Sequence, residues 1–183
     1  MKNRALNSFA CLPFYLLFLL PGASIALAYP AAALSDAKET PPLKQSTLDE
    51  NSNRKRAEKA FRDWQDGTGS ITDLLADNLK WTIVGRSRSS RTYNSKKQFI
   101  DEVLQPFGTR FSQRFRPVNV RGAYVDGNTV IVHWDGEGTR LDGKPYKNTY
   151  AWFMRFEDGL VVEATAFYDS IAFNELWDQV TPK

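Results

Sequence analysis

The residues best suited to chemistry are a histidine and an aspartate two positions apart in the segment VIVHWDGEG. His133 and Asp135 share one face of an expected strand, because strand side chains alternate with period two. In a pocket of low dielectric constant the pKa of a carboxyl group rises toward the range of a general base, and a nearby imidazole can relay the proton. The pair predicts proton abstraction next to a carbonyl. The alternative is that Asp135 begins a bend or bulge and His133 is a half-buried packing residue.

The next expected strand carries a face that suits a ligand pocket. Asn148, Tyr150 and Trp152 lie on one face by the same alternation. Ligand pockets are mostly aromatic with a few converging polar groups, and a tyrosine hydroxyl can donate to a carbonyl or to a developing enolate oxygen. We therefore expect Tyr150 as a catalytic donor, with Asn148 and Trp152 binding substrate. The alternative for Tyr150 and Asn148 is a packed core layer, which is the favoured interpretation for Trp152.

Two more aromatic residues are candidate substrate contacts, whereas metal and cofactor chemistry is not expected. Trp81 lies on the first expected strand, and Tyr93 lies in the polar stretch SRSSRTYN, which we expect to form a lip over the cavity mouth. The single cysteine, Cys11, lies in the N-terminal apolar run, and His133 is the single histidine. These counts exclude a disulfide, a cysteine nucleophile and the usual two- or three-histidine zinc site in the folded domain.

Periodicity and turn signals predict the elements that position these residues. Thr47 and Glu50 form a possible capping box, and apolar residues at helical spacing follow as far as Gly67. Three Asp-Gly dipeptides, at 126–127, 142–143 and 158–159, predict an antiparallel meander. The fold class is α+β, with a bent antiparallel sheet packed on helices. The expected order is a helix over 47–67, a short helix capped by Ser70, a strand over 79–84, a helix over 95–107, strands over 115–125, 129–139, 146–156 and 160–168, and a closing helix after Asp169 or Ser170.

The 183 residues divide into an export signal, a leader and one domain. Lys2 and Arg4 precede an apolar run that ends in Ala26-Leu27-Ala28, the pattern of a secretory signal peptide. We expect residues 1–28 to be the signal, 29–46 a flexible leader and 47–183 the domain, located in the periplasm or secreted and free of the membrane after cleavage. The alternative is an uncleaved membrane anchor over 9–28.

The charge pattern bears on partners. The formal net charge is only +3, and it falls when the signal is removed. Arginines alternate with phenylalanines in the segment around Phe115, which favours a solvated sheet face over a nucleic-acid surface. An arginine-lined pocket entrance would prefer an acidic ligand. The basic residues in question are Arg86, Arg88, Arg91, Lys96, Lys97, Arg110, Arg114, Arg116 and Arg121.

Two blocks of the sequence resemble the SnoaL-like domain family. LADNLKWTIVGRSRSSRTYNSKKQFIDEV is similar to the first half of such domains, and VIVHWDGEGTRLDGKPYKNTYAWFMRFEDGLVVEATAFYDSIAFNELW to the second. The resemblance implies the cone of the ketosteroid isomerase and nuclear transport factor 2 superfamily, in which a curved antiparallel sheet wraps helices around an apolar pocket. It also implies a small apolar or carbonyl-containing ligand, isomerase or cyclase chemistry, and a homodimer formed through the sheet.

The sequence departs from the catalytic members of that superfamily. Ketosteroid isomerases place a tyrosine and an aspartate where this chain has Phe61 and Trp81 or Thr82. Epoxide hydrolases of the limonene type use a second aspartate, where this chain has Ala166. This chain therefore lacks at least one catalytic residue of each mechanism. The alternative to an enzyme is a non-catalytic ligand-binding or dimerisation module.

Overall fold

The computed structural model describes residues 43–182, and side chains from residue 49 onward. The predicted signal peptide and most of the predicted leader lie outside these residues. The first helix, α1 (Leu43–Asp66), begins inside the predicted leader, so Thr47 lies within the helix instead of capping it. The helix stops where predicted, before Gly67, whose φ of 76° favours a glycine. Within residues 43–182, no helix combines the length and the apolar character needed to cross a membrane.

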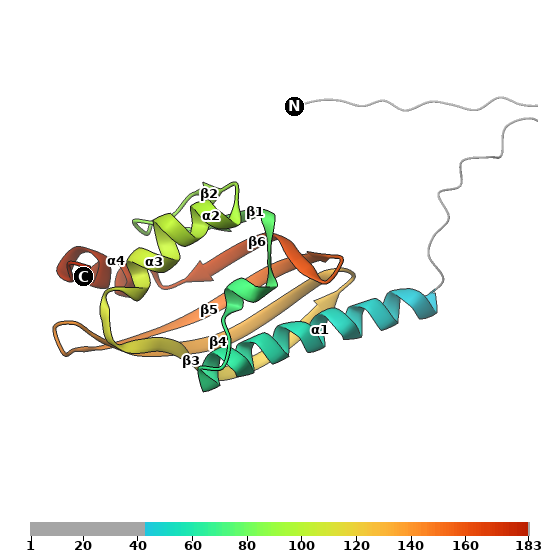
Figure 1. Cartoon of the computed structure of the whole chain (residues 1–183), viewed down its shortest axis with the longest axis horizontal. Helices are drawn as coiled ribbons and strands as arrows, with labels where there is room; N and C mark the ends of the chain where they lie inside the picture. Colours follow the sequence, from blue (N-terminus) through green and yellow to red (C-terminus); the bar gives the residue numbers. More distant parts are fainter. Residues whose placement is uncertain (1–42, 183) are drawn as a thin grey trace, which may run out of the picture. The chain divides into compact units, whose positions relative to one another are not determined.

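A six-stranded sheet packs against α1 (Figure 1). Its strands run in the spatial order β2-β1-β6-β5-β4-β3. The four strands from β3 to β6 form the predicted antiparallel meander, and the three Asp-Gly dipeptides connect them. The bounds are β1 (Leu75–Ile83), β2 (Thr92–Tyr93), β3 (Phe111–Asp126), β4 (Thr129–Arg140), β5 (Pro145–Glu157) and β6 (Leu160–Tyr168).

One pairing corrects the expectation of a wholly antiparallel sheet. Strand β1 runs parallel to β6, with Trp81 opposite Ala164 and Ile83 opposite Ala166. Parallel neighbours need a long crossover, and here the connection includes β2, the helical run over residues 96–108 and three strands of the meander. No local turn signal specifies such a pairing. The α+β class is confirmed, and the sheet is mixed.

Short helices face the sheet, and their caps agree with the sequence. Ser70 caps the 3₁₀ turn η1 (Ile71–Leu74), and Ser95 caps the run formed by α2 (Lys96–Phe99), η2 (Ile100–Leu104) and α3 (Gln105–Gly108). This run is the predicted helix over 95–107, and its middle part is a π-turn. Pro106 follows that turn and has no N–H for the preceding helical ladder. Asp169 caps α4 (Ser170–Gln179) through a bond from the Ile171 N–H, 2.8 Å long.

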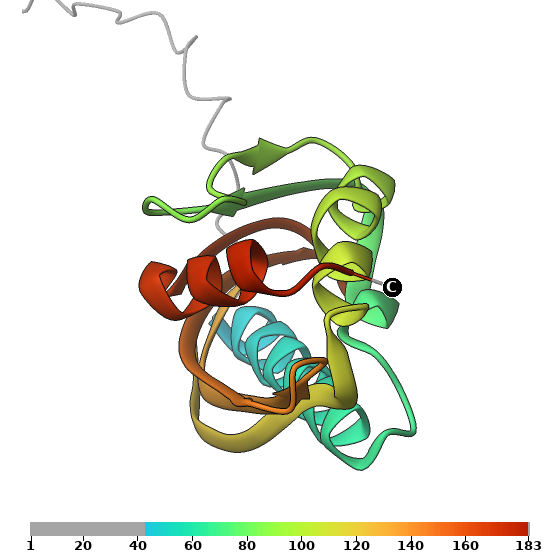
Figure 2. The same cartoon turned by 90° about the vertical axis from the view of Figure 1, so that its left-hand side faces the viewer.

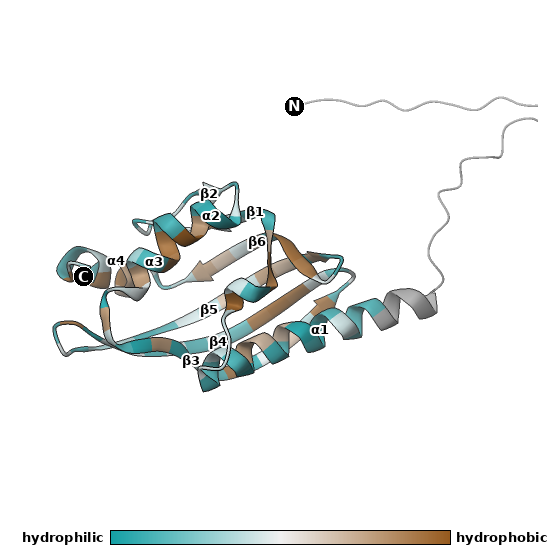
Figure 3. Cartoon of the chain, in the orientation of Figure 1, coloured by the Kyte–Doolittle hydropathy of each residue, from teal (hydrophilic) through white to brown (hydrophobic). Residues whose placement is uncertain are grey.

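The sheet curves around α1, as Figure 2 shows. Side chains of β4 alternate along the strand: Val130, Val132 and Trp134 are fully buried, and the residues between them are half-buried. Figure 3 shows the hydrophobic residues gathered in the strands and in the run from α2 to α3, whereas α1 is mostly hydrophilic. The concave inner face of the sheet is therefore the apolar one.

Candidate functional site

A cavity of about 210 Å³ is bounded by the inner face of the sheet and by the helices. The sheet contributes Trp81, Trp134 and Trp152 to its wall, and the run from α2 to α3 contributes Phe99, Val103 and Phe107. Apart from the tryptophans, the polar residues of the lining are few: Tyr150, Tyr168, Ser70, Thr72 and Arg114. Among the described residues that line the cavity there is no Asp, Glu, His, Lys or Cys.

Aromatic rings packed against one another form the wall. The rings of Trp134 and Tyr150 stack with centroids 4.2 Å apart, and those of Trp81 and Phe99 with centroids 4.5 Å apart. Trp152 meets both tryptophans edge to face, at 5.0 Å from Trp81 and 4.9 Å from Trp134. Such contacts fix ring orientation and add to the free energy of burial. The wall is therefore preformed.

The indole N–H groups of Trp81, Trp134 and Trp152 are buried and have no acceptor within the described part of the chain. A buried donor that lacks an acceptor costs free energy, and edge-to-face ring contacts compensate only weakly. The cavity wall therefore carries hydrogen-bonding capacity that the chain does not use for itself.

The hydroxyl of Tyr150 is the end of a short hydrogen-bonded chain. The Asn148 amide donates to the Tyr146 hydroxyl over 3.0 Å, and the Tyr146 and Tyr150 hydroxyls are 3.2 Å apart. Because Tyr146 already accepts from Asn148, it is able to donate its own hydrogen to Tyr150. The Tyr150 hydrogen is then available to a ligand. Burial raises the pKa of Tyr150 well above its usual value, so the phenol is a neutral donor.

The predicted lip over the cavity mouth lies beside Tyr168. The Ser87 hydroxyl is 2.9 Å from that of Tyr168, whose pKa burial raises. Tyr93 lies beneath the same loop and donates to the Ser89 carbonyl over 2.8 Å. Tyr93 is therefore an anchor of the loop, and it is not among the residues that line the cavity.

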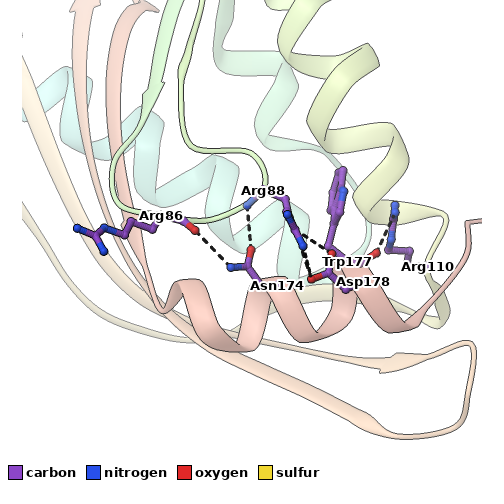
Figure 4. Close-up of polar contacts among 6 residues, drawn as sticks. All are labelled: Arg86, Arg88, Arg110, Asn174, Trp177 and Asp178. Atoms are coloured by element: carbon purple, nitrogen blue, oxygen red, sulfur yellow. Dashed lines mark hydrogen bonds and ion pairs between the residues drawn. The ribbon is translucent and has the colours of Figure 1, made fainter.

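Helix α4 holds this loop in place (Figure 4). The Arg88 guanidinium donates to both carboxylate oxygens of Asp178, at 2.9 and 3.0 Å. The Asn174 amide accepts from the Arg88 N–H over 2.8 Å and donates to the Arg86 carbonyl over 3.3 Å. Phe173, on the same helix, lines the cavity. The helix and the loop therefore close this end of the site together.

A buried arginine also contacts the C-terminal part of α4. Arg110 lies over the Trp177 ring at 4.0 Å and donates to the Trp177 carbonyl over 3.4 Å, as Figure 4 shows. No carboxylate pairs with it in the described part of the chain, and burial lowers its pKa. Its contacts hold the helix, so its role is structural.

Asp135 and His133 lie on the outer face of the sheet, opposite the cavity. Asp135 accepts from the Arg121 guanidinium at 2.8 Å, from Thr149 at 2.7 Å and from Asn119 at 3.1 Å. The bond from Arg121, aided by the other two donors, lowers the pKa of Asp135 to about 2. The expectation of a pocket carboxylate with a raised pKa is therefore corrected in both position and direction of the shift.

The structure also differs from the bend proposed as the alternative for Asp135. Strand β4 continues through Asp135, which pairs with Thr149, and the following Gly136 pairs with Asn148. The irregularities lie in the partner strand β3. Gly136 lies on the inner face, where a Cβ atom would be 2.2 Å from the Phe115 ring. The glycine therefore makes room for an aromatic ring beside the cavity.

Of the predicted site residues, Tyr150, Trp81 and Trp152 lie together in the cavity wall. Asn148 is absent from the lining, because its amide is used by the backbone of Asp169, donating to its carbonyl over 3.0 Å and accepting from its N–H over 3.1 Å. Sequence reasoning missed Trp134 and several other wall residues. Their signal was present as the apolar alternate positions of β4, on the face opposite His133 and Asp135.

Solved structures of the nuclear transport factor 2-like class share this fold. Bal32a, from a soil-derived mobile gene cassette, is 19% identical, with a TM-score of 0.58 over 70% of this chain and 98% of that one. A protein from Jannaschia sp. CCS1, described as a SnoaL-like polyketide cyclase, is 18% identical, with a TM-score of 0.55 over 69% of this chain and 92% of that one. TerC, crystallised with polyporic acid, is 20% identical, with a TM-score of 0.56 over 69% and 98%.

The family model of the SnoaL-like domain matches residues 57–164, and the chain belongs to that family. This confirms the resemblance that the two sequence blocks carry. No curated protein matches the sequence.

Proposed function

We propose that this domain binds a small, flat, largely apolar molecule with a carbonyl oxygen in the inner cavity. The observation that carries the proposal is the cavity itself, walled by stacked aromatic rings and reached by the hydrogen-bonded chain that ends at Tyr150. An engineered cavity of about 150 Å³ accepts benzene. A volume of about 210 Å³ therefore suits a ligand of roughly one or two rings.

Tyr150 supplies the polar contact in this proposal. Its neutral hydroxyl donates to the carbonyl oxygen, while the rings of Trp134 and Trp152 contact the flat faces of the ligand. A carbonyl oxygen that replaced water here would meet donors already held in place, which reduces the entropy lost on binding. Similar structures support a small-molecule role: one neighbour is described as a SnoaL-like polyketide cyclase, and another was crystallised with polyporic acid.

The proposal favours binding over proton abstraction. A general base needs a pKa near the working pH and a position within hydrogen-bond reach of the proton. The described residues of the lining offer no carboxylate or imidazole, and Asp135 lies on the opposite face with a pKa of about 2. An isomerase or cyclase would require a base at the inner face, so turnover of a ketone substrate would contradict this part of the proposal.

Replacing either of two alanines by leucine tests where the ligand binds. Ala166 lines the cavity and Ala151 lies half-buried on the outer face of the neighbouring strand. Ala166→Leu should remove binding of an aromatic ketone, followed by tryptophan fluorescence, whereas Ala151→Leu should leave it unchanged. Thermal melting of both variants checks that each is folded. Equal binding by the two variants would overturn the proposal.

The outer face supports a second, compatible role as a homodimer interface. Phe153 and Phe167 are 39% and 43% exposed, and their rings meet edge to face at 5.7 Å. Exposed aromatic pairs on a sheet are typical of association surfaces. We propose that a second copy covers this pair, and that Phe153→Glu with Phe167→Glu yields a monomer in sedimentation analysis. A wild-type protein that is monomeric at high concentration would contradict the proposal.

Export is proposed on the sequence pattern alone. Cleavage after Ala28 would leave Tyr29 as the first residue of the exported protein. N-terminal sequencing of the protein from the culture medium or periplasm tests this, and an intact Met1 in a membrane fraction would indicate an anchor.

A further inference from the structure

Arg114 is the single charged residue among the described residues that line the cavity. It lies near the start of β3, directly before Phe115, whose buried ring packs 6.0 Å from Trp64. Its own side chain is exposed. Arg114 therefore combines a place in the cavity lining with access to water, which is the position of a residue at the mouth.

Several other basic side chains have partners. Arg88 pairs with Asp178, Arg91 with Glu102 and Arg121 with Asp135. Arg116, two positions along the strand, donates to the Gln65 carbonyl. Arg114 makes neither a hydrogen bond nor an ion pair with any residue of the described part of the chain. Its five N–H donors are therefore free to meet a ligand.

A hydroxyl beside the mouth points to the same kind of ligand. The Ser70 oxygen accepts from the Thr72 N–H over 3.2 Å and from the Thr72 hydroxyl over 2.9 Å. Both Ser70 and Thr72 line the cavity. Since Ser70 accepts twice and no acceptor for its own hydrogen lies within the described residues, its hydroxyl is a further donor. The lining thus presents hydrogen-bond donors and no carboxylate, and the nearby Asp73 carboxylate is engaged by the Ser70 N–H over 3.0 Å.

We propose that Arg114 selects an aromatic carboxylate, whose rings enter the cavity while its carboxylate stays at the mouth against the guanidinium. The inference rests on the proposed function and specifies the class of ligand. A carboxylate at the mouth keeps part of its hydration, so it avoids the cost of full burial. A guanidinium matches both carboxylate oxygens, and such paired bonds are stronger than neutral ones.

Two probes of one shape test the inference. The probes are 2-naphthoate and the neutral 2-naphthalenemethanol, each titrated into the whole folded protein and followed by tryptophan fluorescence. Wild type should bind the carboxylate about tenfold more tightly, with a preference that shrinks as salt rises. Arg114→Gln should reduce this preference to about twofold or less and leave the alcohol unchanged. Arg116→Gln is the matched control and should retain the preference.

The outcomes separate the two proposals. Equal binding of both probes to wild type, or a preference that survives in Arg114→Gln, overturns the role of Arg114 while cavity binding stands. Binding of neither probe to wild type counts against the proposed function itself, and the inference falls with it. A preference lost equally in the Arg114 and Arg116 variants would indicate a general effect of positive charge and would also overturn the inference.

Discussion

The two faces of the sheet treat polar groups in opposite ways. On the outer face, Asp135 is surrounded by donors that lower its pKa to about 2. On the inner face, burial raises the pKa of Tyr150, so its hydroxyl stays protonated, 3.2 Å from that of Tyr146. The outer face carries the residue types that suggest catalysis, whereas the cavity that could bind a ligand lies on the inner face. The comparison teaches that a chemically suggestive pair has to be weighed together with the face on which a cavity forms.

The largest expected effect comes from Trp134, the inner-face residue at the centre of the aromatic wall. Trp134→Ala should lower the free energy of unfolding by about 3–5 kcal/mol, because it leaves a cavity beside Tyr150 and Trp152. Phe153→Ala, on the outer face, should cost about 1 kcal/mol or less. Urea denaturation measures both. Similar costs at the two sites would contradict the division between the faces.

Substitution of Asn148 should cause the next largest loss of stability, because its amide joins β5 to the start of α4. Asn148→Ala removes bonds to Tyr146 and to both backbone groups of Asp169, and should cost about 2 kcal/mol. Hydrogen exchange should increase first in α4. Asn119→Ala, an outer-face control that loses one bond to Asp135, should cost well under half as much. Equal costs would show that Asn148 does not act as a clamp.

The contribution of Asp135 to the free energy of unfolding should depend on pH. Its folded pKa of about 2 lies below the ordinary value of 3.8, so its contribution to stability is complete above about pH 4 and is lost as pH falls from about 4 to 2. Asp135→Asn should cost about 1 kcal/mol at pH 7, and the difference from wild type should vanish near pH 2. Ligand binding should be unchanged. Loss of binding or of any enzymatic turnover in this variant would restore the predicted catalytic role.

Tyr150 gives the smallest change in stability and the most selective change in binding. Tyr150→Phe keeps the ring stacked on Trp134 and removes the donor, so the protein should lose about 1 kcal/mol or less. Affinity for an aromatic ketone should fall about five- to tenfold, and affinity for the matching hydrocarbon should stay the same. Calorimetric titration with both compounds measures this. A parallel loss for both would show that the ring, and not the hydroxyl, carries the effect.

Local signals predicted much of this fold. The Asp-Gly turns fixed the meander, Ser70, Ser95 and Asp169 cap the helices as expected, and the alternation along β4 and β5 is correct. Each of these features depends on residues close in sequence. The parallel pairing of β1 with β6 joins distant segments, and nothing local encodes it.

The candidate site was predicted only in part for a related reason. Alternation shows which residues share a face, but the inner face is decided by what packs against it, and here α1 covers the apolar side through Phe61 and Trp64. The lack of a carboxylate partner for Arg114 likewise depends on where the carboxylates of other elements lie. Tyr150, Trp81 and Trp152 were found because aromatic residues on a buried face fit a cavity wall as well as a core.

The most direct test of binding at the inner face is an NMR titration of ¹⁵N-labelled protein with 2-naphthoate. The indole N–H signals of Trp81, Trp134 and Trp152 should shift together, while the backbone amides of His133 and Asp135 stay in place. Shifts confined to His133, Asp135 and their outer-face neighbours, with unchanged indole signals, would contradict the account and place the site on the other side of the sheet.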